Sequence, residues 1–462
     1  IRKQMFKRKI EKYLKEWKSD EHKMPLIIKG CRQCGKTFSV LDFAHKNYEH
    51  VVYIDFFQHP EYKSVFDGGL DIDLLCMTLS TLIPDANFVS GKTCIIFDEI
   101  QECPRARTAL KFFKTDGRYD VIGTGSLLGV SGYHTNASSE APIPVGYETI
   151  IDMYPMDFEE WLWANGIKKM TIDYLHRCLE EKTPVQEAIH ERMRQLLLQY
   201  CIVGGMPRAV SVFMETHNMQ NVLRMQQAII EEYKVDMLKY APQADKSRIR
   251  ECFESIPRQL SKENKKFAYA TVRSNGRGRD YQGSLQWIED AGIIRRCYNL
   301  SAPELPLDGN SIPDQFKVYM ADTGLFISML EPGTAADILQ GNLYGYKGAI
   351  FENLVADIFG KMNRKLYYFR KDSGLEIDFV TRYEGKCTLV EVKASNGNIK
   401  SAKTILSNPE KYHVSQAIKL GDVNVGTAPQ TLILPLYMAF LLKNKQSSLK
   451  YRNPKNNPDR ND

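Results

Sequence analysis

PLIIKGCRQCGKTFSV, residues 25–40, joins an apolar run to the octet Gly30–Thr37. The octet contains the complete pattern G-x-x-x-x-G-K-[ST], in which a glycine-rich loop binds the phosphates of a nucleotide. A strand-like run precedes it, and the apolar residues after it have helical spacing. Because strand, loop and helix occur in the required order, we predict a phosphate-binding loop here rather than a glycine-rich turn with an accidental lysine.

Each residue type in the octet suits this chemistry. Gly30 and Gly35 let the backbone turn tightly and direct N–H groups at phosphate oxygens. Lys36 places a positive charge at the β- and γ-phosphates, and the Thr37 hydroxyl is a ligand of the kind that Mg²⁺ prefers. The residues expected to contact the nucleotide are Gly30, Cys31, Arg32, Gln33, Cys34, Gly35, Lys36, Thr37 and Phe38.

A second motif, TCIIFDE at residues 93–99, is an apolar strand that ends in two carboxylates. Asp98 stands where a carboxylate binds Mg²⁺ at the C-terminal end of a strand. Glu99 is of the type that takes a proton from an attacking water, so it is the candidate catalytic base beside Lys36. Without the phosphate loop, a buried strand ending in an acidic turn would be the simpler interpretation. With the loop, we expect ATP and Mg²⁺ as cofactors.

Length and composition set the wider limits. A chain of 462 residues exceeds one hydrophobic core, which predicts two to four domains. Its 43% hydrophobic and 11% aromatic content is that of a globular protein, and a net charge of +6 permits a nucleic-acid surface without requiring one. The ten cysteines show no disulfide framework and no apolar run reaches membrane-spanning length, so we expect a soluble cytoplasmic protein.

Cys31 and Cys34 form a C-x-x-C pair inside the phosphate loop. A redox or metal-binding role is one interpretation of this spacing. No second C-x-x-C occurs at zinc-binding spacing, and loop positions that face away from phosphate tolerate small side chains. We therefore prefer the interpretation that these cysteines are small side chains facing away from the phosphates, without a redox or metal-binding role.

The N-terminal third alternates strands and helices. Residues 2–18 predict an amphipathic helix, residues 51–56, 93–98, 121–126 and 148–154 predict strands, and residues 71–82 and 104–115 predict helices. This order predicts an α/β fold with a parallel sheet covered on both faces. Thr124 and Ser126 end one strand and are candidate sensors of the γ-phosphate, although a simple glycine turn would also explain them. Residues 129–147 predict a mobile loop.

The middle of the chain changes character. A helical region from Met156 to about Tyr240, interrupted by GGMPR at residues 204–208, predicts a lid on the nucleotide domain. Residues 246–300 predict three short helices and a strand pair, the composition of a winged helix. Arg273, Arg277 and Arg279 are candidate contacts to nucleic-acid phosphates. A winged fold used only for protein packing is the alternative.

The last region, residues 315–442, predicts a second α/β unit with a helix at 348–361 and strands at 366–369, 376–383, 388–393 and 432–436. Glu391 and Lys393 share one strand face, and Asp378 is expected to end or bend the neighbouring strand. With Glu352 they form a candidate nuclease site that would bind a second Mg²⁺ or Mn²⁺ at Asp378 and Glu391. An exposed E-x-K on an amphipathic strand is the simpler alternative.

These motifs resemble a large bacterial and archaeal group of predicted ATPases of the AAA type. The matching stretches are Gly30–Thr37, Phe97–Cys103, Thr124–Ser126, Tyr154–Leu162, Gly204–Pro207, Val318–Leu325, Phe351–Val355 and the strand pair 374–393. The resemblance implies a P-loop ATPase domain at 1–155, a helical lid at 156–243, a winged helix at 244–314, a PD-(D/E)XK nuclease-like α/β domain at 315–442 and a disordered basic tail at 443–462. Glu352, Asp378, Glu391 and Lys393 fall on the positions expected for the nuclease-like fold.

One departure from the resemblance concerns arginine. AAA ATPases commonly place a trans-acting arginine after the sensor strand, but residues 127–150 contain none. Arg105, Arg107 and Arg118 are candidate replacements, and Arg208 is the candidate lid arginine. The sequence therefore leaves open whether ATP turnover depends on a homo-oligomer.

The combined prediction is Mg²⁺-dependent ATP binding and hydrolysis coupled to a C-terminal half that binds nucleic acid, DNA in the first instance, and is a candidate nuclease. The alternative is a slow ATP-dependent switch or scaffold whose degenerate nuclease-like domain serves only for binding.

Overall fold

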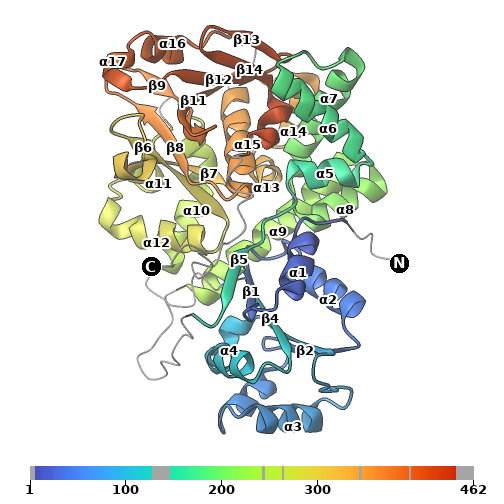
Figure 1. The fold of residues 1–462 in the computed structure, drawn as a ribbon. Helices are drawn as coiled ribbons and strands as arrows, with labels where there is room; N and C mark the ends of the chain where they lie inside the picture. Colours follow the sequence, from blue (N-terminus) through green and yellow to red (C-terminus); the bar gives the residue numbers. More distant parts are fainter. Residues whose placement is uncertain are drawn as a thin grey trace, which may run out of the picture. The chain divides into compact units, whose positions relative to one another are not determined.

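The computed structural model describes residues 6–126, 146–241, 245–262, 265–342, 346–394 and 397–443. The chain divides into two compact units (Figure 1). The first unit comprises Ile1–Lys168, Leu196–Arg296 and Val318–Asp357, and the second comprises Lys169–Gln195, Cys297–Lys317 and Ile358–Asp462. The predicted loop at 129–147 and tail at 443–462 lie almost wholly outside the described residues. The predicted domain boundaries stay a prediction.

A five-stranded parallel sheet forms the centre of the first unit, which confirms the predicted α/β fold. Its order is β2 (His50–Asp55), β3 (Thr93–Asp98), β4 (Asp120–Gly125), β1 (Leu26–Lys29) and β5 (Thr149–Asp152). Every neighbouring pair of these strands is parallel. All five carboxyl ends therefore meet at one edge, where ligands bind in sheets of this kind.

The two faces of this sheet are covered by different helices. Ile27 packs in a cluster with α3 (Ile72–Leu82) and α4 (Pro104–Asp116). Leu26 and Ile28 pack in another cluster with α1 (Ile10–Ser19) and α2 (Lys36–Asn47). Successive side chains of a strand point to opposite faces, so the continuous apolar run of β1 serves both clusters. The prediction of a sheet covered on both faces is confirmed.

The first helix is shorter than the sequence predicts. We expected it to begin near residue 2, but α1 begins at Ile10, and the described residues 6–9 are not helical. The reason lies in tertiary contacts, because the Arg8 side chain and the Lys9 backbone bind groups outside the helix. Glu11 accepts a hydrogen bond from the Arg8 backbone at 3.0 Å, which stabilises the helix start.

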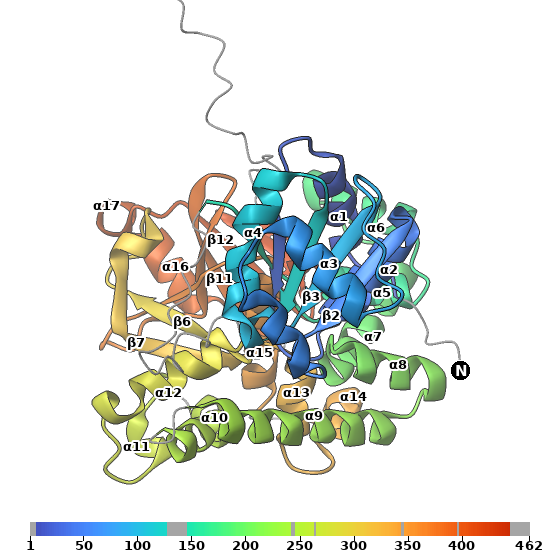
Figure 2. The same ribbon diagram turned by 90° about the horizontal axis from the view of Figure 1, so that it is seen from below.

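Most of the rest of the first unit is helical, as predicted for the region after residue 156. Figure 2 shows α9 (Met219–Tyr240) lying beside its neighbours α8, α10 and α13. The three helices predicted within residues 246–300 are present, but in place of the predicted strand pair the described residues of this range contain one strand, β6 (Ile294–Leu300). The winged-helix assignment stays a proposal. The helices are α5 (Phe158–Ala164), the second part of α7 (Glu187–Val203), α8 (Pro207–Thr216), α10 (Lys246–Leu260), α11 (Tyr269–Val272), α12 (Gly278–Asp290), α13 (Thr323–Ser328), α14 (Thr334–Gln340) and most of α15 (Lys347–Lys361).

The second unit contains a five-stranded mixed sheet. Its order is β10 (Phe379–Tyr383), β11 (Lys386–Val392), β12 (Gln416–Gly421), β14 (Thr431–Pro435) and β13 (Gly426–Ala428), with antiparallel pairs at both edges. A four-stranded sheet has the order β7 (Ser311–Met320), β6 (Ile294–Leu300), β8 (Leu366–Arg370) and β9 (Glu376–Ile377). The helices α6 (Lys169–Glu181), α16 (Lys400–Leu406) and α17 (Pro409–Tyr412), with the first part of α7 and the end of α15, also belong to this unit.

The predicted strand 376–383 is divided at Asp378 into β9 and β10. We predicted that this residue ends or bends its strand, and the structure confirms it. The Asp378 carboxylate accepts a hydrogen bond from the Val392 backbone at 2.8 Å, a side-chain contact in place of a ladder bond. The sequence did not predict α14, α16, α17, β12 or β13, which are short or lack strong periodicity.

All ten cysteines lie among the described residues, and each is a buried free thiol. In the same described part of the chain, every helix is too short or too polar to cross a bilayer. The predicted cytoplasmic location is not tested by this finding.

A glycine pair connects α7 to α8 in the first unit. Gly204 has φ +68°, and a Cβ atom there would stand 2.1 Å from Asp322 Oδ1. The Asp322 carboxylate accepts hydrogen bonds from the Gly205 backbone at 2.7 Å and the Leu325 backbone at 3.2 Å. Gly204 is therefore fixed by both its left-handed conformation and the absence of space.

We expect Gly204→Ala to lower the free energy of unfolding by at least ~2 kcal/mol, because it adds a steric clash to an unfavourable backbone conformation. Gly166→Ala is the matched control: its φ is +77° and nothing lies within 4 Å of its Cβ position. The control should lose only about 1 kcal/mol. Urea unfolding of both variants is the measurement, and equal losses would contradict the packing argument.

Candidate active site

The phosphate loop spans the six residues between the end of β1 at Lys29 and the start of α2 at Lys36. A Cβ atom on Gly30 would stand 2.0 Å from the Met153 carbonyl oxygen, so no side chain fits there. Gly35 caps α2 in the left-handed region, with φ +99°. Both glycines of the motif are thus required by the backbone path. Phe38 follows on the exposed face of α2.

Lys36 is buried and folded back over the loop. Its Nζ donates to the carbonyl oxygens of Gly30 and Cys31, both at 2.9 Å. Thr37 points the other way, and its Oγ1 donates to Asp98 Oδ2 at 2.8 Å. The loop thereby presents a cation and a hydroxyl at the carboxyl edge of the sheet, as the sequence predicted.

Three hydroxyl groups hold the Asp98 carboxylate, those of Thr37, Tyr53 and Thr124. Tyr53 donates at 2.8 Å, and the pKa of this phenol is raised by its burial and then by the charge of Asp98. The Thr37 hydroxyl and the Asp98 carboxylate lie side by side at the end of β3. Two adjacent oxygen ligands of these types fit Mg²⁺, which is bound through few protein ligands with the rest from water and phosphate.

Glu99 follows Asp98 in a left-handed conformation with φ +48°. Its carboxylate accepts hydrogen bonds from the Ser126 hydroxyl at 3.0 Å, from the Ser126 backbone at 3.3 Å and from Gln101. The two candidate sensors therefore contact the acidic pair directly, Thr124 at Asp98 and Ser126 at Glu99. Detection of a γ-phosphate by either residue stays a prediction.

Helix α9 contributes two carboxylates to the loop. Arg32 is paired with Asp236, and Gln33 donates to Glu232. Burial raises the pKa of the Asp236 carboxyl while the charge of Arg32 opposes that rise. The candidate lid arginine Arg208 reaches the same place.

The side chain of Arg208, near the start of α8, is half exposed and lies beside the phosphate loop. Its Nη1 donates to Gln33 Oε1 at 3.1 Å and to Glu232 Oε1 at 3.3 Å. The structure therefore brings Arg208 to the phosphate loop, where a lid arginine is expected.

The C-x-x-C pair is held inside the loop. The hydrogen bond between the two thiols lowers the pKa of Cys34, and the charges of Lys36 and Arg8 add to that effect. The same bond, with burial, raises the pKa of Cys31. Nothing in the described ranges forms a group of three His, Cys, Asp or Glu side chains able to hold a metal ion.

Sequence reasoning missed Arg8, Tyr53 and Asp236. Tyr53 carried a weak signal, because it lies in a predicted strand and points to the same side as Asp55. Arg8 and Asp236 carried none, since their partners are more than a hundred residues away or in the loop itself.

The candidate nuclease residues are divided between the units. Glu352 belongs to the first unit, where its buried carboxylate is paired with Lys265 and accepts from the Tyr319 hydroxyl at 3.0 Å. Asp378, Glu391 and Lys393 belong to the second unit. The joining of Glu352 to the other three therefore stays a prediction.

In the second unit, Glu391 is engaged by protein groups. Its Oε2 lies 2.6 Å from Lys393 Nζ, and its Oε1 accepts from the Ala402 backbone at 2.8 Å. Lys419 pairs in register with Glu391 on the next strand, and its pKa is lowered by burial and by the charges of Lys393 and Lys403. Lys419 interacts electrostatically with Glu391, Lys393 and Lys403, so this part of the second unit contains lysines as well as the predicted carboxylates.

The three candidate nucleic-acid arginines lie between α11 and the first turn of α12. All three are exposed. Their acidic neighbours are loosely placed: Arg273 lies 4.0 Å from Glu251, and Arg279 lies 3.8 Å from Asp280. Exposed pairs at such distances contribute little, so these guanidinium groups are accessible to phosphates.

Three family models match separate parts of the chain. Residues 22–162 match an AAA domain, residues 194–335 match a domain of unknown function (DUF8612), and residues 347–437 match another domain of unknown function (DUF4143). The AAA match includes the phosphate loop, the acidic strand and the sensor strand. It supports the expected AAA-type ATPase domain.

No curated protein matches the chain. Among solved structures, the Walker-type ATPase of Pyrococcus abyssi is 14% identical with a TM-score of 0.40, covering 71% of this chain and 97% of its own. The Orc1 protein of Aeropyrum pernix in complex with DNA is 11% identical with a TM-score of 0.29, covering 73% and 95%.

We expect Lys36→Ala to remove ATP binding, because Lys36 is the cation that the loop itself contributes to the phosphates. Lys46→Ala, on the exposed side of the same helix, is the control and should bind like the unchanged protein. The thermal shift produced by ATP–Mg²⁺ is the measurement. An undiminished shift in Lys36→Ala would mean that the loop is not the site.

Proposed function

We propose that this protein binds ATP with Mg²⁺ and hydrolyses it. The observation that carries the proposal is the direct contact between Thr37 of the loop and Asp98 of the acidic strand, beside Lys36. Phosphate-binding groups and metal-binding groups thereby meet at the carboxyl edge of a parallel sheet. The AAA match over residues 22–162 supports the same activity.

The residues divide the chemistry between them. The loop N–H groups and Lys36 bind and orient the phosphates. Thr37 and Asp98 would hold Mg²⁺, which when bound neutralises charge on the phosphate oxygens. Glu99 would accept a proton from the attacking water, because it is the carboxylate next to the metal-binding one. Arg208 would add positive charge from the lid side of the loop.

A slow ATP-dependent switch is the second candidate. The Glu99 carboxylate is hydrogen-bonded to Ser126 and Gln101, so its oxygens are engaged by the protein where a base would have to face the attacking water. The chain also lacks arginine at residues 127–150. Steady-state phosphate release, with and without DNA, separates rapid turnover from a slow switch.

We expect Glu99→Gln to keep ATP binding and to slow phosphate release by about 100-fold or more, because the amide has the same shape but cannot accept the proton. Glu102→Gln is the matched control. Glu102 lies in the turn that follows Glu99 and is paired with Lys63, so this variant should retain turnover. Phosphate release under single-turnover conditions is the measurement. Unchanged turnover in Glu99→Gln would move the base elsewhere, to Glu102 or Asp55.

We also propose that the arginines between α11 and α12 contact nucleic acid, with DNA as the first ligand to test. Their exposure and weak acidic pairing support this function. The lysines around Glu391 support phosphate binding by the second unit rather than metal-dependent cleavage. We further propose that ATP turnover is coupled to binding at these arginines or at the lysines near Glu391.

Replacing Arg273, Arg277 and Arg279 with serine should weaken DNA binding and reduce the slope of log K against log salt by up to about 3, since each phosphate contact contributes ~0.9. The control replaces Lys168, Lys169 and Lys182, which are also exposed and remove the same charge. Fluorescence anisotropy over a salt series is the measurement. Equal slopes for both triple variants would leave general charge, or packing, as the role of this segment.

A further inference from the structure

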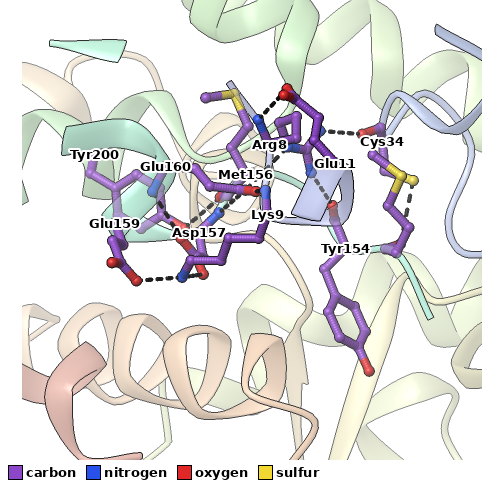
Figure 3. A network of polar contacts seen from close by, with 11 residues as sticks. Arg8, Lys9, Glu11, Cys34, Tyr154, Met156, Asp157, Glu159, Glu160 and Tyr200 are labelled. Atoms are coloured by element: carbon purple, nitrogen blue, oxygen red, sulfur yellow. Dashed lines mark hydrogen bonds and ion pairs between the residues drawn. The ribbon is translucent and has the colours of Figure 1, made fainter. Parts of the chain in front are cut away.

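Arg8 lies just before the start of α1 and reaches into the back of the phosphate loop (Figure 3). Its Nη1 donates to the Cys34 carbonyl oxygen at 2.9 Å, and its Nη2 donates to the Tyr154 carbonyl oxygen at 2.7 Å. The Arg8 side chain is only 8% exposed. One buried guanidinium therefore joins the loop to the chain that leaves β5.

Glu160 fixes the orientation of Arg8. Its Oε2 lies 3.1 Å from Arg8 Nε, and its Oε1 accepts from the Lys9 backbone at 2.6 Å. Glu160 is also part of the capping box of α5, where Asp157 and Glu160 each accept from the backbone of the other. Arg8 is thus held by a buried carboxylate whose own position is set by a helix start.

Lys9 also binds the start of α5, but its side chain does not contact the phosphate loop. Its Nζ pairs with Asp157 and lies 2.7 Å from Glu159. Burial would lower the pKa of Lys9, but the two carboxylates outweigh it and raise that pKa. Figure 3 shows Arg8 and Lys9 pointing to opposite sides of the segment, one to Cys34 and the other to the acidic start of α5.

The contact at Cys34 bears on phosphate binding through the geometry of one peptide group. A trans peptide is planar, so its C=O and N–H point in opposite directions. The C=O of Cys34 and the N–H of Gly35 belong to the same peptide. By holding the Cys34 oxygen on the outer side of the loop, Arg8 directs the Gly35 N–H to the inner side, where the phosphates bind.

We propose that Arg8 is a positioning residue for ATP, which sets the Cys34–Gly35 peptide so that the Gly35 N–H can donate to phosphate. The inference rests on the proposed ATP binding. It adds a residue outside the loop motif to the binding machinery.

The test compares ATP affinity in variants of the full chain. Arg8→Lys keeps the positive charge but cannot bond both carbonyl oxygens, and it should weaken ATP binding about tenfold, the loss expected for one charge-assisted hydrogen bond. The double variant Arg8→Met, Glu160→Gln avoids a buried unpaired charge and should show at least the same loss while remaining folded. Lys9→Met is the control and should lower the melting temperature without changing ATP affinity.

Chemical rescue gives a readout that a purely structural role would not move. In Arg8→Ala, millimolar guanidinium should occupy the space beside Glu160 and Cys34 and restore ATP affinity. It should have no effect on Lys36→Ala. Near-normal ATP affinity in both the lysine and the double variant would overturn the proposal, as would equal losses in Lys9→Met. Absence of ATP binding in the unchanged protein would instead refute the proposed function.

Discussion

The hydrogen bond between Thr37 and Asp98 joins two parts of the sheet that are not neighbours. Thr37 follows β1 and Asp98 ends β3, while β4 lies between those strands. Thr124, near the end of β4, donates to the other oxygen of Asp98. The carboxyl ends of three adjacent strands are therefore bound to one carboxylate, and the parallel register of the sheet determines whether these groups can meet.

The features that the sequence predicted were those encoded locally. The phosphate loop needs glycines at fixed positions, and Gly30 and Gly35 are where the backbone leaves no room or turns left-handed. The continuous apolar run of β1, the acidic end of β3 and the bend at Asp378 are likewise visible in short windows. The start of α1 was not, because the partners of Arg8 lie 26 and 146 residues away. The apolar pattern of a helix cannot show that the residues before its first turn bind carbonyl groups distant in the sequence.

The second unit shows the same limit at a charged site. The spacing of Glu391 and Lys393 was readable, and the structure places their charged groups 2.6 Å apart. The lysines at 419 and 403 come from β12 and α16, neither of which was predicted. Their approach depends on strand register and helix placement, and it adds positive charge near Glu391. Local spacing suggested a metal ligand set, but it could not show that lysines from other elements would lie near Glu391.

The tight packing of Gly204 and Gly205 has a mechanical consequence. A glycine pair between two helices is often taken for a hinge. Here the Cβ positions of both residues fall about 2 Å from Asp322 Oδ1 or the Met156 carbonyl oxygen. The glycines therefore let the backbone pack directly against Asp322 and Met156. The Met156 backbone also donates to the Gly205 carbonyl oxygen at 2.7 Å. Any displacement of α8, with Arg208 on it, must then carry the start of α5 and α13 along as one rigid group.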